Sequence, residues 1–305
     1  MKRHFSLLWA TLFAFISCSS QATEQVIEED KNTDVVVEDG NSLLWRIEKD
    51  GYQTAYMYGT MHIIEAEYYH FTDKMTEKIK NSDAIIMEVG GMPNPIETLN
   101  LMELDSGDIR SIFSNEEMKT IVEFFDKKLG QDPDSFFKMY GKMKPFFILQ
   151  AISQHYFSDN TESYDLDIMS IAGQNEIPLV GLETLEQQLG FFDAIPQNKM
   201  NEMIIGSIED FEKEKKSTAK MMKIYSEQRV DKLIPLMSKQ SPEMMEYSDI
   251  FLYDRNKAWI PKIMQEMKTR KVFIAVGAAH LLGEGGLIDL LEKEGFTLTA
   301  VSTDA

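Results

Sequence analysis

Short apolar runs alternate with helix-like segments along the chain from about residue 42 onward. Two apolar-rich stretches, 43–47 and 54–58, flank Lys49-Asp50-Gly51, and this pattern predicts a β-hairpin with a glycine-containing turn. Further apolar runs each follow a segment with helical spacing, as is typical of strands buried in a sheet. These runs span 83–89, 177–182, 271–276 and, after a helix at 287–293, 297–302.

The middle of the chain has a different period. Between about 95 and 160, and again between about 185 and 268, Met, Ile, Leu and Phe recur with the spacing of amphipathic helices. The 20 methionines are expected to fill the core of these helices rather than to bind a metal. Together the patterns predict an α/β (α+β) fold, with a mixed central β-sheet flanked by helices and a large helical insertion in the middle.

The N-terminus has the features of an export signal. Lys2 and Arg3 precede an apolar run at 5–16, which is shorter than the roughly 20 residues of a membrane-spanning helix. A small residue directly before Cys18 resembles the bacterial lipoprotein signal, so we expect Cys18 to be lipidated. The alternative is an ordinary signal peptide cut nearby, which would leave a free thiol. We therefore expect an exported protein that is lipid-anchored to the cell envelope, and Ser19 after the cysteine resembles signals that direct lipoproteins to the outer membrane.

Composition indicates how the rest of the chain is organised, and the net charge argues against nucleic acid as a partner. After a signal peptide at 1–18, the segment 19–41 is polar and acidic, and it is expected to form a flexible tether to a domain at 42–305. With 31 Lys and Arg against 50 Asp and Glu, the formal net charge is −19. Nucleic acid is therefore not an expected partner, because phosphate binding needs clustered basic residues.

Two histidines stand at the ends of predicted strands. His62 closes Gly59-Thr60-Met61-His62, and His280 closes Gly277-Ala278-Ala279-His280. A glycine at the end of a strand allows a sharp turn, and a histidine three residues later then projects above the carboxyl edge of the sheet. Ligands bind at this edge in open α/β sheets, so turns on neighbouring strands would place both imidazoles in one crevice.

A carboxylate and three further histidines complete the candidates. Glu88 lies near the end of an apolar run, where an unpaired charge is costly to bury. Two imidazoles and a carboxylate would suit a divalent metal, although Glu88 could instead form a salt bridge or be partly exposed. His4 is removed with the signal peptide, and His70 and His155 are expected to be structural.

Several blocks of the sequence, in order from about 42 to 302, together resemble the TraB/PrgY/GumN family. The blocks are Leu44-Trp45, 58–62, 82–88, 178–184, Arg255-Asn256-x-x-Trp259, 276–283 and 285–287. The resemblance implies the fold of the erythromycin esterase and ChaN-like group, a mixed sheet surrounded by helices. The Tiki proteins, which resemble this family, are metal-dependent peptidases that use two Gly-x-x-His motifs and a glutamate. By position, these correspond to His62, His280 and Glu88.

The resemblance also implicates residues outside the two turns. Asp165 stands where the family often has Gly-x-Asp, although Ser163 replaces the glycine. Arg255 could bind a substrate carboxylate with two hydrogen bonds, steady an acid of the site, or pair with Glu183 or another buried carboxylate. For Glu183 itself we favour a role as a helix-start residue stabilised by the helix dipole.

Three functional hypotheses follow. The favoured one is a metal-dependent hydrolase that cuts a peptide or another amide or ester bond, with a Mn, Co or Zn ion held by His62, His280 and Glu88. Glu88 could alternatively stay off the metal and act as general base. The second hypothesis is a non-catalytic lipoprotein that binds a metal, haem or a peptide, as pheromone-sequestering members of the family do. In the third, both turns are structural and their histidines donate to backbone carbonyls. The resemblance places the hydrolase first.

Overall fold

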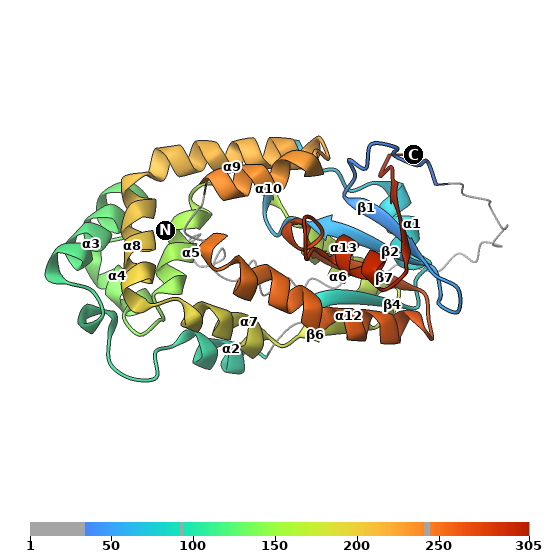
Figure 1. The fold of residues 1–305 in the computed structure, drawn as a ribbon. Coiled ribbons are helices and arrows are strands. Elements are labelled where there is room, and N and C mark those ends of the chain that lie inside the picture. The colour runs from blue at the N-terminus through green and yellow to red at the C-terminus, as the bar shows by residue number, and fades with distance from the viewer. Residues whose placement is uncertain (1–33, 92–93, 241–244, 305) are drawn as a thin grey trace.

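The computed structural model describes residues 34–91, 94–240 and 245–304, which form a central sheet with helices on both faces and a helical lobe beside it (Figure 1). The sheet has six strands in the order β6-β4-β7-β2-β1-β8. Strands β2, β7, β4 and β6 are mutually parallel, whereas β1 is antiparallel to both β2 and β8. The strands are β1 (Leu44–Glu48), β2 (Ala55–Thr60), β4 (Ala84–Val89), β6 (Leu179–Glu183), β7 (Val272–Gly277) and β8 (Thr297–Val301). The predicted mixed sheet is confirmed.

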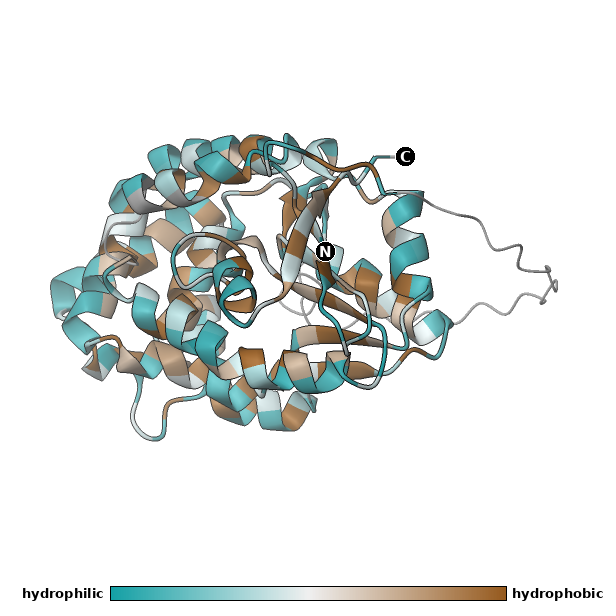
Figure 2. Ribbon diagram, turned by 45° about the vertical axis from the view of Figure 1, so that its right-hand side comes forward, coloured by the Kyte–Doolittle hydropathy of each residue, from teal (hydrophilic) through white to brown (hydrophobic). Residues whose placement is uncertain are grey.

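Alternate residues of the strands face two separate hydrophobic cores. In β7, Phe273 and Ala275 belong to the core on one face, and Ile274 and Val276 belong to the core on the other. The first core is covered by α1 (Asp73–Lys80), α6 (Tyr164–Gln174), α9 (Phe211–Ser226) and α10 (Val230–Gln240). The second is covered by α12 (Asp254–Met267) and α13 (Leu287–Lys293). Because both faces are buried, the central strands read as nearly continuous apolar runs, and Figure 2 shows them as apolar ribbons enclosed by helices.

The helical middle of the chain forms a third hydrophobic core, beside the sheet. Buried Phe125, Phe136, Tyr140 and Ile148 belong to this core, and the three aromatic rings lie edge-on or tilted to one another. Its helices are α3 (Asn115–Leu129), α4 (Pro133–Tyr140), α5 (Phe146–Gln154) and α8 (Gln197–Glu209). This lobe confirms the predicted helical insertion.

Shorter elements connect the lobe to the sheet. A two-stranded sheet joins β3 (Ile64–Glu65) to β5 (Thr161–Glu162). The short helices are η1 (Ala66–Tyr68), α2 (Pro95–Met102), η2 (Ile109–Ser111), α7 (Leu185–Gly190), η3 (Phe191–Ala194), η4 (Asp249–Tyr253) and η5 (Ala278–His280). Among the described residues, no helix combines the length and the apolar character needed to cross a bilayer.

The described part of the expected tether, 34–41, begins in contact with the domain. The carboxylate of Asp34 is 2% exposed and forms ion pairs with Lys78 at 2.9 Å and Arg46 at 3.1 Å. Among the described residues, contact with the domain is therefore already present at Asp34, within the segment expected to be a tether. The predicted signal peptide and Cys18 lie outside the described residues.

Candidate functional site

The two Gly-x-x-His turns lie side by side at the carboxyl edge of the sheet. Strands β2 and β7 are parallel neighbours, and Thr60 is in register with Gly277. A Cβ atom at Gly59 would come within 3.0 Å of the Cα of Ala278, so a glycine lets the second turn pack this closely on the first strand. Both turns thus lie at the ends of strands, as expected, and the pairing of β2 with β7 brings them together.

His62 is an accessible imidazole held by a carboxylate. Its Nδ1 lies 2.8 Å from Oδ2 of Asp165, in the first turn of α6, and the Oδ1 atom of Asp165 accepts a hydrogen bond from Thr60. The charge of Asp165 raises the pKa of His62 to about 9, against a smaller effect of burial. The side chain of His62 is 65% exposed, so Nε2 is the ring nitrogen that could bind a ligand, in exchange for the proton that it carries below the pKa.

His280 is held in the opposite way, by a buried amide. Its Nδ1 lies 2.7 Å from Oδ1 of Asn256, and its ring packs against Trp259 with centroids 4.5 Å apart. The residue is 4% exposed. Burial, assisted by the nearby charge of Arg255, lowers the pKa of His280 to about 4, although Glu88 opposes the shift. His280 is therefore neutral at pH 7.

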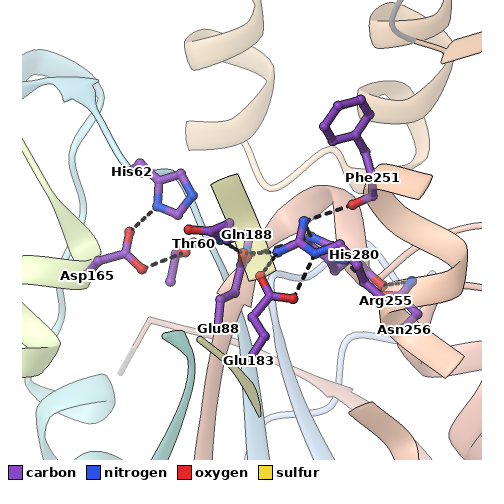
Figure 3. A network of polar contacts seen from close by, with 11 residues as sticks. Thr60, His62, Glu88, Asp165, Glu183, Gln188, Phe251, Arg255, Asn256 and His280 are labelled. Carbon is purple, nitrogen blue, oxygen red and sulfur yellow. Dashed lines mark hydrogen bonds and ion pairs between the residues drawn. The ribbon is translucent and has the colours of Figure 1, made fainter. Parts of the chain in front are cut away.

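Glu88 lies between the two imidazoles, at the end of β4 (Figure 3). Its Oε1 accepts the backbone N–H of Gly277 at 2.9 Å, and its Oε2 accepts from Gln188 at 2.9 Å and from Arg255 at 2.6 Å. Burial alone would raise the pKa of Glu88, but the charge that His280 carries once protonated, the charges of His62 and Arg255, and the Gly277 hydrogen bond lower it to about 2. Glu88 is thus ionised at pH 7, in a pocket that already satisfies both of its oxygens.

Arg255 uses all of its donors inside the protein. Its Nε and Nη2 bind both oxygens of Glu183, its second Nη2 hydrogen goes to Glu88, and Nη1 reaches the carbonyl of Phe251 and Nε2 of His280. Since a guanidinium has five N–H groups, none remains for a substrate carboxylate in this arrangement. The structure therefore supports the expected pairing with buried acids and not the expected binding of a substrate carboxylate.

Glu183 requires a correction. It is the last residue of β6, with its carboxylate on Arg255, and the adjacent helix α7 is capped by Thr184 and Gln187 in a capping box. The predicted role as a helix-start residue is wrong, because the carboxylate has a buried cation as its partner. Burial raises the pKa of Glu183, and the two hydrogen bonds from Arg255 counteract that shift.

The third hypothesis predicted different contacts for the histidines. Among the described hydrogen bonds, the ring nitrogens of His62 and His280 contact side chains, namely those of Asp165, Asn256 and Arg255, rather than backbone carbonyls. The ring nitrogens of both histidines are therefore held by polar side chains rather than by the backbone.

The donor chemistry of this network fits a divalent metal only in part. Both imidazoles have Nδ1 on a side-chain oxygen, the usual environment of histidines that bind a metal through Nε2. However, within the described ranges no three His, Cys, Asp or Glu side chains are placed to share an ion. Nη1 of Arg255 lies 3.2 Å from Nε2 of His280, so it would have to withdraw before His280, Glu88 and His62 could act together.

The residues that complete the network were not among the predicted site residues. Asn256 stood beside Arg255 in a recognised block, but nothing in its local pattern assigns it to His280. Gln188 and Thr60 reach Glu88 and Asp165 only because α7 and β2 fold next to them. His70 and His155, which were expected to be structural, lie outside this network. His70 lines a cavity with Tyr164 and Tyr225, and His155 is the C-cap residue of α5.

Comparison with known proteins agrees with the sequence blocks. The family model described as TraB/PrgY/gumN matches residues 43–300. The chain is 24% identical over 259 residues to the uncharacterized protein YbaP of Shigella flexneri and to that of Escherichia coli K12. In each case the match covers 83% of this chain and 94% of the relative. No solved structure gives a significant match.

Proposed function

The chain belongs to the TraB/PrgY/gumN family, and from this premise we propose that it is a metal-dependent hydrolase that cuts a peptide or another amide or ester bond. The observation that carries the proposal is the pair of imidazoles at one sheet edge, each held at Nδ1 by an oxygen, with an ionised carboxylate between them. His62, His280 and Glu88 would hold a Mn, Co or Zn ion. Such an ion, when bound, would activate a water molecule and polarise the scissile carbonyl.

The charges of the network support a cationic occupant. The carboxylates of Glu88, Glu183 and Asp165 face one guanidinium, that of Arg255, and one ionisable partner, His62. The three carboxylates outnumber these two cations even when His62 is protonated. An added positive ion would therefore be attracted electrostatically to this edge of the sheet.

The pKa of Glu88 bears on its role. A general base works best when its pKa is near the working pH, whereas the surrounding cations hold the pKa of Glu88 at about 2. We therefore assign Glu88 to charge stabilisation and ion binding rather than to proton abstraction. The hydrogen bonds from Gln188 and the Gly277 backbone keep its two oxygens in place for that role.

A peptide library tests the proposed activity. The full-length protein would be stripped with a chelator and incubated with the library after adding Mn²⁺, Co²⁺ or Zn²⁺, with product masses as the readout. We expect cleavage with at least one ion, and its loss in His62→Ala and His280→Ala. His70→Ala is the matched control, because His70 lies outside the network. Absence of cleavage under every ion, in protein whose metal content is verified by elemental analysis, would contradict the proposal.

Non-catalytic binding of a metal, haem or peptide is the second candidate. The difference in exposure favours it, because the His62 side chain is 65% exposed whereas that of His280 is 5% exposed. A single accessible imidazole can bind haem iron or one metal ion without completing a catalytic set. Under this alternative, haemin would give a Soret shift that His62→Ala abolishes, and bound peptide would keep its mass during long incubation with metal.

We also propose that the protein is exported and anchored through lipid at Cys18, at the outer membrane. The basic start, the short apolar run and the small residue before Cys18 support this proposal. Fractionation of cells that express the full chain would test it. Wild-type protein should be recovered with the membranes and carry the mass of a lipid, and Cys18→Ser should lose both properties. Recovery of the wild type as an unmodified soluble protein would contradict the anchor.

A further inference from the structure

The amide of Asn256 can be oriented without ambiguity. Asn256 is fully buried near the start of α12. Its Nδ2 donates to the carbonyl of His280 at 3.2 Å and to that of Gly285 at 3.0 Å. Since a primary amide has two N–H donors, both are used. The opposite amide orientation would place an oxygen against two carbonyl oxygens, so Oδ1 must be the atom that faces the ring of His280.

This orientation determines where the ring of His280 carries its hydrogen. Oδ1 of Asn256 is an acceptor and lies 2.7 Å from Nδ1, so Nδ1 must be the donor. On the other side of the ring, Nη1 of Arg255 lies 3.2 Å from Nε2. A guanidinium only donates, so Nε2 must be the acceptor. Two independent neighbours thus require the same tautomer.

We propose that Asn256 is a positioning residue that fixes His280 in the Nδ1–H tautomer, with the Nε2 lone pair directed into the site. The contact to the His280 carbonyl ties the amide to the same residue whose ring it orients, so the backbone and the ring of His280 are held together. Asp165 has the corresponding place on His62, but as a charged acceptor on an exposed ring. The tautomer stands on geometry alone, whereas its use in ligand binding rests on the proposed hydrolase.

Nitrogen NMR of the full-length protein labelled with ¹⁵N-histidine tests the tautomer directly. The sequence has five histidines, and a His280→Gln variant would assign the signals of His280. We expect wild-type His280 to show a protonated Nδ1 and an unprotonated Nε2. A protonated Nε2, or signals averaged between the two tautomers, would overturn the inference whether or not any variant folds.

Substitutions at Asn256 separate positioning from packing. Asn256→Leu keeps a similar volume but removes the acceptor, so we expect the His280 signals to move toward a mixture of tautomers. Asn256→Asp restores an acceptor toward Nδ1 and should restore the protonated Nδ1, while its second oxygen faces the carbonyls of His280 and Gly285, so we also expect a lower free energy of unfolding. Unchanged His280 signals in a folded Asn256→Leu variant, judged by unchanged His70 and His155 signals, would show that Asn256 has no positioning role.

Calorimetric titration with Zn²⁺ or Mn²⁺ then distinguishes this inference from the proposed function. Loss of a partner that orients a metal-binding histidine weakens affinity about 10- to 100-fold, so we expect that loss in Asn256→Leu and substantial recovery in Asn256→Asp. A fixed tautomer in a wild type that binds neither ion would contradict the metal site and leave the positioning of His280 intact. Tight binding that Asn256→Leu does not weaken would overturn the functional part of the inference.

Discussion

Replacing Arg255 by Met tests whether one cation holds the carboxyl edge of the sheet together. The Arg255 side chain is 8% exposed, and its partners Glu88 and Glu183 are 10% and 5% exposed. Methionine keeps most of the aliphatic volume of the arginine, whereas the guanidinium that it removes lies over the rings of Trp259 and Phe191. The substitution therefore removes mainly the charge and its hydrogen bonds, and leaves two carboxylates facing each other.

The expected loss is large because the partners are buried. Removing one member of a buried ion pair typically costs about 3–5 kcal/mol, since the remaining charge loses its counter-ion but not its desolvation. We expect the unfolding free energy of Arg255→Met at pH 7 to fall by about 4 kcal/mol. Adding Glu183→Gln should recover part of this loss, because the neutral amide no longer repels Glu88. Lowering the pH should also reduce the difference in unfolding free energy between Arg255→Met and the wild type, since the carboxylates that have lost Arg255 can then bind protons.

Urea unfolding followed by circular dichroism and tryptophan fluorescence would measure these differences. Arg110→Met is the matched control, because the Arg110 side chain is 62% exposed and pairs with Asp108 at the surface, where an ion pair contributes little. A loss in Arg255→Met no larger than that in Arg110→Met would refute the reasoning. So would a double variant less stable than Arg255→Met alone.

Three further predictions concern His280, Tyr225 and Asp34. The pKa of His280 is about 4 in the folded chain and about 6.5 in the unfolded chain, so the unfolded state binds the proton first as the pH falls. The contribution of His280 to the free energy of unfolding is therefore complete above pH 6.5 and should fall by about 3 kcal/mol toward pH 4. Urea midpoints measured at several pH values should show a smaller loss in His280→Gln than in the wild type. Tyr225→Phe should lower the free energy of unfolding by about 1–2 kcal/mol, because the buried hydroxyl donates to the carbonyl of Gly59 at 2.7 Å. A lower thermal midpoint would show this loss. Asp34→Ala should lower the free energy of unfolding at pH 7 by about 1–3 kcal/mol, because the Lys78 side chain is only 9% exposed and loses its carboxylate partner. An unchanged urea midpoint would show that Asp34 is not part of the stable domain.

The strands were predictable because burial on both faces leaves a continuous apolar run. The runs at 83–89 and 271–276 correspond to β4 (Ala84–Val89) and β7 (Val272–Gly277), with ends that differ by one residue. The helix expected at 287–293 coincides with α13. In contrast, β3 (Ile64–Glu65) has two residues and no periodic signal, so it was not predicted.

The site was predictable where the chemistry is carried by a strand end, and not where it depends on tertiary packing. Gly59 and Gly277 indicated the two turns in the sequence, because a glycine at the end of a strand allows a sharp turn and a close approach of the backbone. The partners of Glu88 come from α7 and α12, and Arg255 is 167 positions away along the chain. A glutamate directly before a helix also has an ordinary local explanation, so the sequence left both a helix-start role and a pairing with Arg255 open for Glu183, and the tertiary contact decides between them.

The cost of the buried charges is itself an argument that this edge of the sheet has a function. Replacing a buried ion pair or triad by well-packed apolar side chains is often neutral or stabilising, so the arrangement Glu88–Arg255–Glu183 is not explained by stability. Elsewhere the faces of the same sheet are filled mainly by apolar side chains, among them Ile, Val, Phe and Ala. The charged residues gather instead at the carboxyl ends of parallel strands, beside two imidazoles oriented by an amide and a carboxylate. Polar groups that are costly to bury, fully hydrogen-bonded and placed where α/β sheets bind ligands are better explained by a ligand or a reaction than by the needs of folding.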